Sequence, residues 1–137
     1  MTFLDTAYFL ALTSKRDALH DDALAWSGFL PGPVLTTEYV LWEVVNSLSD
    51  PRNRPKAHGL LRGIEDNPKI EAVPADRDLL RSGLTLHAER PDKYWSLTDC
   101  ISFVVMRQAG INEALTSDHH FEEAGFVALL RQPPPAH

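Results

Sequence analysis

Four acidic residues occupy positions in the sequence where a carboxylate could take part in chemistry. Asp5 directly follows a short apolar run, and Asp118 stands two residues beyond Thr116, at the end of another. Glu43 lies inside an apolar run, and Asp99 enters a stretch that is apolar nearly all round. Because an unpaired carboxylate in apolar surroundings is costly, acids in such settings need a partner.

The partner that the sequence favours is a divalent cation. No Lys or Arg lies within residues 41–45 or 100–106, the apolar runs that hold or follow Glu43 and Asp99. Oxygen ligands select hard cations, so we expect Mg²⁺ or Mn²⁺ rather than zinc. Such an ion lowers the pKa of a bound water and stabilises charge on a phosphodiester. The acids therefore predict phosphoryl chemistry, and a nuclease in particular.

Three of these acids also have a purely structural interpretation. Asp5 could cap the helix that it precedes, and Asp118 could cap a turn over residues 119–123. Ser96 and Asp99 have the spacing of a capping box. A carboxylate at a helix start can cap and bind metal at once, so both roles stay open.

The elements that must position these acids alternate along the chain. Strands are predicted at residues 2–4, 34–36, 70–73, 113–116 and 127–130, and helices at 7–13, 17–30, 38–48, 56–66, 77–88 and 97–109. This alternation, without a hairpin signal, predicts an α/β fold with a parallel sheet and helices on both faces. Ligands bind beyond the carboxyl ends of such strands, where Asp5 and Asp118 are expected to meet. Glu43 and Asp99 would reach the same rim from their helices.

Composition sets the limits of this interpretation. The chain has 137 residues, 44% of them hydrophobic, which suits one domain. We predict a domain at 1–131 and a disordered Pro-rich tail at 132–137. No apolar stretch approaches the ~18 residues of a membrane span, and no signal-type start is present, so a cytoplasmic location is expected. Cys100, a single cysteine, excludes an internal disulfide.

The charge and the remaining motifs are less informative. The formal net charge of −6 is weak evidence against a nucleic-acid partner. Arg52, Arg54 and Lys56 form the densest basic cluster, interpreted first as a solvated loop and second as phosphate contacts. His119 and His120 invite a metal interpretation, which we do not favour because histidine ligation suits zinc better.

The tryptophans and tyrosines are expected mainly in the core or at interfaces. Trp26, Trp42, Tyr94 and Trp95 are the residues concerned. Tyr94 and Trp95 precede Asp99 in a predicted loop, and we keep open that they stack a base there.

Four segments together resemble the motifs of PIN-domain ribonucleases. They read MTFLDT (1–6), TTEYVLWEV (36–44), SLTDCIS (96–102) and LTSDHHFEEAGF (115–126). The likeness covers nearly the whole chain and is strongest to the VapC-type toxins of bacterial toxin–antitoxin pairs. It implies a three-layer α/β/α sandwich with a central parallel sheet of four to five strands. It also implies an Mg²⁺- or Mn²⁺-dependent endoribonuclease, a homodimer and a cognate antitoxin that inhibits it.

The resemblance carries over residue by residue. Asp5, Glu43, Asp99 and Asp118 match the acidic positions of the family and are the predicted catalytic and metal-binding residues. Thr6 and Ser117 match small hydroxyl residues that support the acids, whereas Trp42 departs from the smaller or polar residue usual before the second acid.

Two alternatives remain. Glu38 lies five positions before Glu43, about 140° around a helix, so we choose Glu43 and assign Glu38 to the helix start. A catalytically inert PIN-like binding or scaffolding module would keep the fold but typically lose an acid. All four acids are present here, which favours the enzyme.

Overall fold

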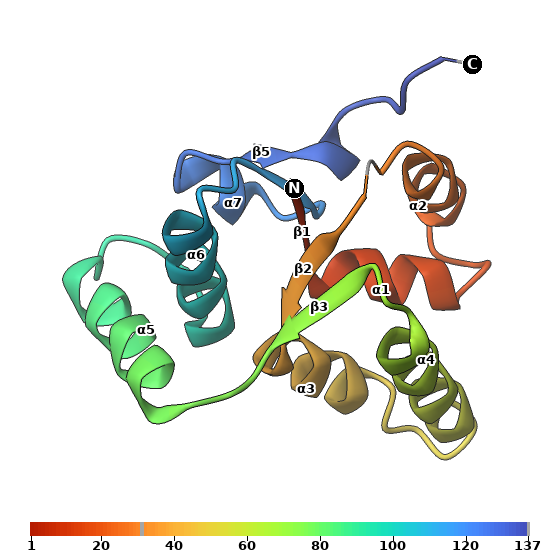
Figure 1. Cartoon of the computed structure of the whole chain (residues 1–137), viewed down its shortest axis with the longest axis horizontal. Coiled ribbons are helices and arrows are strands. Elements are labelled where there is room, and N and C mark those ends of the chain that lie inside the picture. The colour runs from red at the N-terminus through yellow and green to blue at the C-terminus, as the bar shows by residue number, and fades with distance from the viewer. Residues whose placement is uncertain (31, 137) are drawn as a thin grey trace.

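The central sheet is entirely parallel in the computed structural model, which describes residues 1–30 and 32–136 (Figure 1). Its strand order is β3-β2-β1-β4-β5, and each neighbouring pair is parallel. The strands are β1 (Thr2–Leu4), β2 (Val34–Thr37), β3 (Ile70–Val73), β4 (Glu113–Leu115) and β5 (Val127–Ala128). Because parallel strands need crossover connections, a helix or helix pair lies between each strand and the next.

Helices cover both faces of this sheet. They are α1 (Thr6–Thr13), α2 (His20–Ser27), α3 (Glu38–Ser47), α4 (Arg54–Asp66), α5 (Arg77–Glu89), α6 (Leu97–Ala109) and α7 (His119–Glu123), with a 3₁₀ turn at Leu129–Arg131. Figure 1 shows α5 and α6 on one side of the strands and α1, α2 and α4 on the other. The predicted three-layer α/β/α sandwich is confirmed.

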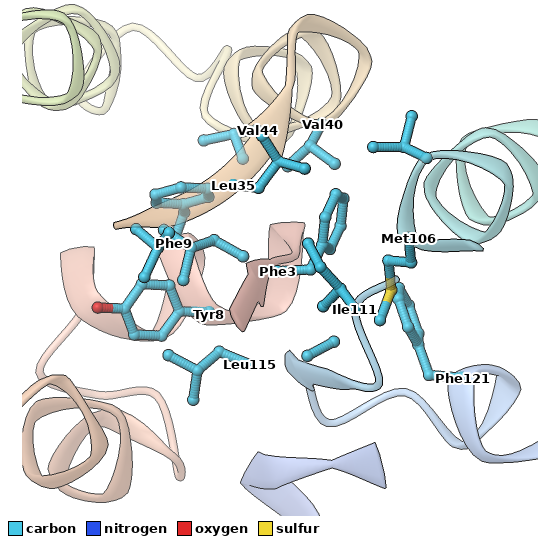
Figure 2. Packing of buried hydrophobic residues seen from close by; sticks show 14 of the residues in the cluster. Phe3, Tyr8, Phe9, Leu35, Val40, Val44, Met106, Ile111, Leu115 and Phe121 are labelled. Carbon is cyan, nitrogen blue, oxygen red and sulfur yellow. The ribbon is translucent and has the colours of Figure 1, made fainter. Parts of the chain in front are cut away.

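The core is built around β1, the middle strand of the sheet. All three of its residues are buried, as expected for a strand covered on both faces. Figure 2 shows Phe3 among side chains from neighbouring strands and helices. The Phe121 ring meets the Phe103 ring edge-on at 4.9 Å between centroids. The Phe121 ring also lies 6.5 Å from the ring of Phe3, which belongs to β1. Because a buried aromatic contributes roughly 1.5–3 kcal/mol, Phe3 anchors the strand that directly precedes Asp5.

Helix α6 is the most deeply buried helix element near the site, and its ends are well defined. Ser96 and Asp99 form the capping box that the sequence predicted. Gly110 ends the helix with a φ of 68°, a left-handed conformation that glycine adopts without strain. These two caps define where α6 begins and ends, and so where Asp99, in its first turn, lies relative to the sheet.

Two predicted elements are shorter than expected. The helix predicted at 17–30 spans only His20–Ser27. It begins later than predicted because the Asp17 carboxylate accepts the N–H of Leu19 at 2.8 Å, which forms a local turn in place of the first helical turn. The strand predicted at 127–130 stops at Ala128. The Leu130 N–H then donates to the carbonyl of Thr116 at 3.1 Å within the 3₁₀ turn.

The remaining boundaries agree with prediction to within two residues, and the turn expected at 119–123 is the short helix α7. Gln132, the first residue of the predicted tail, accepts the indole N–H of Trp26 at 3.4 Å, while disorder of the tail stays a prediction. The predicted break at Pro31 and the tail end at His137 lie outside the described residues. Within the described part of the chain, no helix is both long and apolar enough to cross a membrane.

Candidate active site

Asp5 stands at the carboxyl end of β1, in the middle of the sheet. Its backbone N–H donates to the carbonyl of Leu115 at 3.2 Å and so continues the pairing with β4. Its side chain makes no cap for α1, so the capping alternative is wrong for this acid. Instead, Oδ2 accepts the hydroxyl of Thr116 at 2.7 Å. Only 5% of Asp5 is exposed.

Thr116 joins two of the predicted acids. While its hydroxyl donates to Asp5, the same oxygen accepts the N–H of Asp118 at 3.0 Å. Asp118 also caps α7, because its carboxylate accepts the N–H of His120 at 2.9 Å. Asp118 therefore caps a helix, as the sequence allowed, and its carboxylate still lies at the rim of the sheet beside Asp5.

Asp99 reaches the same rim from the first turn of α6. Its Oδ2 accepts the N–H of Ser96 at 3.1 Å, which completes the capping box, and lies 2.9 Å from Nδ1 of His120. The same Nδ1 lies 3.3 Å from Oδ1 of Asp118. His120 therefore bridges two carboxylates that are far apart in sequence.

Glu43 completes the group from α3. Thr37 caps this helix by accepting the N–H of Val40 at 3.1 Å, and Val40 and Val44 anchor the helix in the core. Glu43, only partly buried, projects beside them. Glu38, the first residue of the helix, instead accepts the N–H of Ala75 at 2.6 Å.

The four acids line one open hollow of about 430 Å³. Its lining consists of Asp5, Glu43, Asp99 and Asp118 together with Thr6, Ala7, Leu10, Ser117 and His119. The structure thus brings together all four acids selected from the sequence, and it puts both predicted hydroxyl neighbours beside them. Their chemical role stays a prediction.

Burial disfavours the charged form of two of these carboxylates, Asp5 and Asp99. It raises the pKa of Asp5 to about 7; the Thr116 hydrogen bond lowers that pKa in part, and Asp99 and Glu43 raise it further. Burial likewise raises the pKa of Asp99, against the hydrogen bond from His120. In the described residues no Lys or Arg forms an ion pair with any of the four acids. The donor set therefore fits a hard divalent cation.

His120 is the site residue whose role the sequence did not reveal. Burial alone would lower its pKa, but the hydrogen bond to Asp99 and the nearby Asp118 carboxylate raise it above the ordinary value. Asp118, His119 and His120 each offer a ligand atom within 4.8 Å of the others. We nevertheless interpret His120 as a positioning residue, because its Nδ1 already faces two carboxylates. No signal near His120 in the sequence points to Asp99, 21 residues away.

Comparison with known proteins supplies the family. A family model described as the PIN domain matches residues 2–127, most of the chain. The chain belongs to the PIN-domain family. This PIN domain is 33% identical over 133 residues to the 23S rRNA-specific endonuclease VapC20 of Mycobacterium tuberculosis, a match that covers 94% of this chain and 98% of the relative.

Solved structures agree with that assignment. The crystal structure of Mycobacterium tuberculosis VapC20, described as a sarcin-ricin loop cleaving toxin, matches with a TM-score of 0.87 at 27% identity, over 94% of this chain and 98% of that one. FitAcB from Neisseria gonorrhoeae matches with a TM-score of 0.68 at 18% identity, over 93% and 95% of the two chains, which supports the fold alone. The predicted PIN-type fold and the predicted resemblance to VapC-type ribonucleases are confirmed.

Proposed function

We propose that this PIN domain is an Mg²⁺- or Mn²⁺-dependent endoribonuclease in which Asp5, Glu43, Asp99 and Asp118 bind the metal and act in catalysis. The observation that carries the proposal is the convergence of four carboxylates on one open hollow without a Lys or Arg partner in the described residues. The likeness to VapC20, an rRNA endonuclease, supports RNA as the substrate.

The reaction is hydrolysis of a phosphodiester. A water oxygen forms a bond to phosphorus, one P–O ester bond breaks, and the proton lost by the water is balanced by one gained by the departing oxygen. A bound Mg²⁺ or Mn²⁺ would supply Lewis acidity and an acidified water. Asp5 and Asp99, the two buried acids, would be its main ligands. Glu43 and Asp118, which are more exposed, would complete the shell or orient water.

Finer assignments follow the same resemblance. We infer that the protein is the toxin of a toxin–antitoxin pair, that a cognate antitoxin blocks it, and that it forms a homodimer. Large-subunit rRNA is the first substrate to test, because VapC20 is named for cleaving it. If ribosomal RNA is the substrate, the enzyme would act in the cytoplasm.

Cleavage of RNA tests the proposal directly. The purified, antitoxin-free chain would be incubated with 23S rRNA and a mixed small-RNA pool in Mg²⁺ or Mn²⁺, with a chelator arm. We expect discrete products that vanish with chelator and with Asp5→Asn. Direct binding of Mn²⁺, followed by calorimetry, should be lost in the same variant.

Asp21→Asn provides the matched control, because it removes one acid from an exposed position on α2. It should cleave as the unmodified chain does. Cleavage that survives Asp5→Asn would reject the assigned site. Folded protein that binds Mn²⁺ but cleaves no RNA would favour the inert PIN-like module.

A further inference from the structure

A second hollow lies beside the acid cluster, on the α3 side. It has a volume of about 220 Å³ and is lined by Tyr39, Trp42, Glu43, Asn46 and Thr98. Glu43 lines both hollows, and Thr98 directly precedes Asp99. A group bound in the second hollow would therefore lie next to whatever occupies the first.

One face of α3 supplies most of this lining. Tyr39, Trp42, Glu43 and Asn46 are spaced three, four and seven positions along the helix, so they form a continuous stripe. Other residues of α3, such as Val40, pack into the core. Trp42 is 66% exposed, which leaves much of its indole available to a ligand.

The other lining residues are Tyr39, whose ring is held in place by a hydrogen bond, and two residues with polar side chains, Asn46 and Thr98. The Tyr39 hydroxyl donates to the carbonyl of Asp76 at 3.0 Å, which holds that ring in place. The side-chain amide of Asn46 and the hydroxyl of Thr98 have no hydrogen-bond partner in the described part of the chain. An aromatic face with an amide and a hydroxyl nearby matches what recognises an unpaired base.

We propose that this second hollow is a subsite for one unpaired nucleobase of the RNA strand whose phosphodiester lies at the acids. The inference rests on the proposed function and names a feature of the substrate, a base splayed out next to the cleaved bond. Trp42 would stack on the base, while Asn46 and Thr98 would contact its edge.

Size and continuity favour a base over a protein segment. The hollow is small, carries polar groups and shares Glu43 with the acid cluster. A larger and more apolar hollow of about 500 Å³ lies along the α3–α4 side, with Leu41, Val45 and Leu61 in its lining. Because Trp42 also borders that hollow, burial of the indole by protein is the competing outcome of the test.

The test measures RNA binding without cleavage. In the Asp5→Asn background, binding of a labelled single-stranded oligoribonucleotide that contains the cleavage site would be compared with binding of versions carrying one abasic position each. If the unmodified chain cleaves nothing, an unstructured mixed-sequence oligoribonucleotide takes its place. Trp42→Ala should weaken binding by about 5- to 150-fold, the range expected for loss of one stacked base, and Trp42→Phe should restore most of it.

Comparing the loss of binding caused by Trp42→Ala with the loss caused by each abasic position identifies the base that stacks on Trp42. At one abasic position the loss should match that of Trp42→Ala, and combining the two should add little. Leu84→Ala removes an exposed apolar side chain from α5 and serves as the control, with binding unchanged. Thermal unfolding would establish that each variant is folded.

Two results would overturn the subsite. The first is unchanged RNA binding by folded Trp42→Ala, including the case where sedimentation shows that only self-association is altered. The second is that, at every abasic position, the fold-losses of binding from Trp42→Ala and from the missing base multiply as if the two were independent. The nuclease assignment fails separately: cleavage absent from the unmodified chain, with Trp42-dependent binding intact, would reject that assignment and keep the subsite.

Discussion

Thr116 and His120 hold the acids of the site in their relative positions. Thr116 links Asp5 to Asp118, and His120 links Asp118 to Asp99. The chain of contacts runs from β1 through the end of β4 to α6. Neither link could be predicted from the sequence, because Thr116 and His120 meet their partners only after folding, and the His119–His120 pair had suggested a metal ligand rather than a contact with Asp99.

His120 should matter for the geometry of the site more than for folding. Replacing it with Ala removes the Nδ1 donor that faces Asp99 and Asp118, and residues that orient metal ligands typically affect affinity or rate by roughly 10–100-fold. His120→Asn keeps a donor near the Nδ1 position and should recover part of that loss. Calorimetric Mn²⁺ affinity and kcat on RNA would both be measured.

His58→Asn, on an exposed face of α4, controls for loss of an imidazole as such. Equal Mn²⁺ affinity and kcat in His120→Ala and the unmodified chain would contradict a positioning role. Loss of both together with a collapse in thermal stability would indicate a structural role instead.

At the scale of elements, the contact between α5 and α6 decides where α6 stands against the sheet. Gly83 of α5 lies so close to Ile101 of α6 that an added Cβ would clash with the isoleucine side chain. The closeness is what lets α5 cover the helix that carries Asp99. A longer side chain at position 83 would have to push the two helices apart.

Gly83→Ala should therefore destabilise the protein by roughly 1–3 kcal/mol, the usual cost of overpacking, measured by urea unfolding. Gly63→Ala in α4 is the matched control, because nothing lies within 4 Å of its added Cβ. That change should be neutral or stabilising by up to about 1 kcal/mol, since alanine favours helix. A Gly83→Ala variant as stable as Gly63→Ala would disprove the close packing.

For the whole molecule, the buried acids make metal-free stability depend on pH. The pKa of Asp5 is about 7 when folded and lies near 3.8 when solvated, so the folded state binds its proton more tightly. Stability of the metal-free chain from this group is therefore highest at low pH. It falls as pH rises from about 4 to about 7, by at most about 4 kcal/mol.

Urea unfolding in chelator at pH values from about 5 to about 8 would measure this dependence, with Asp5→Asn alongside to remove the Asp5 contribution. The gain in stability of Asp5→Asn over the unmodified chain should grow with pH across that window. Mn²⁺ at about 100 times its Kd should add about 2.7 kcal/mol to the unmodified chain, and much less to the variant. A gain that does not vary with pH would refute the raised pKa.

What the sequence determined by itself was local or periodic. Alternation of apolar runs and helical patterns predicted the strands and the parallel sheet, and the Ser96–Asp99 spacing predicted a cap that the structure contains. Asp5 and Asp118 could be assigned to one rim because the carboxyl ends of parallel strands share an edge. The apolar surroundings of Glu43 and Asp99 in the sequence predicted that both acids need a partner. This holds for Asp99, which is buried, whereas Glu43 is only partly buried beside an exposed Trp42.

Tertiary structure alone decided which of these groups touch. The link from His120 to Asp99 spans 21 residues and that from Thr116 to Asp5 spans 111, so no local pattern encodes either. The same holds for Trp42, whose exposure beside Glu43 depends on how α3 packs. Local patterns reflect forces between neighbours in the chain, whereas a site made from distant segments depends on how the whole sheet and its helices pack.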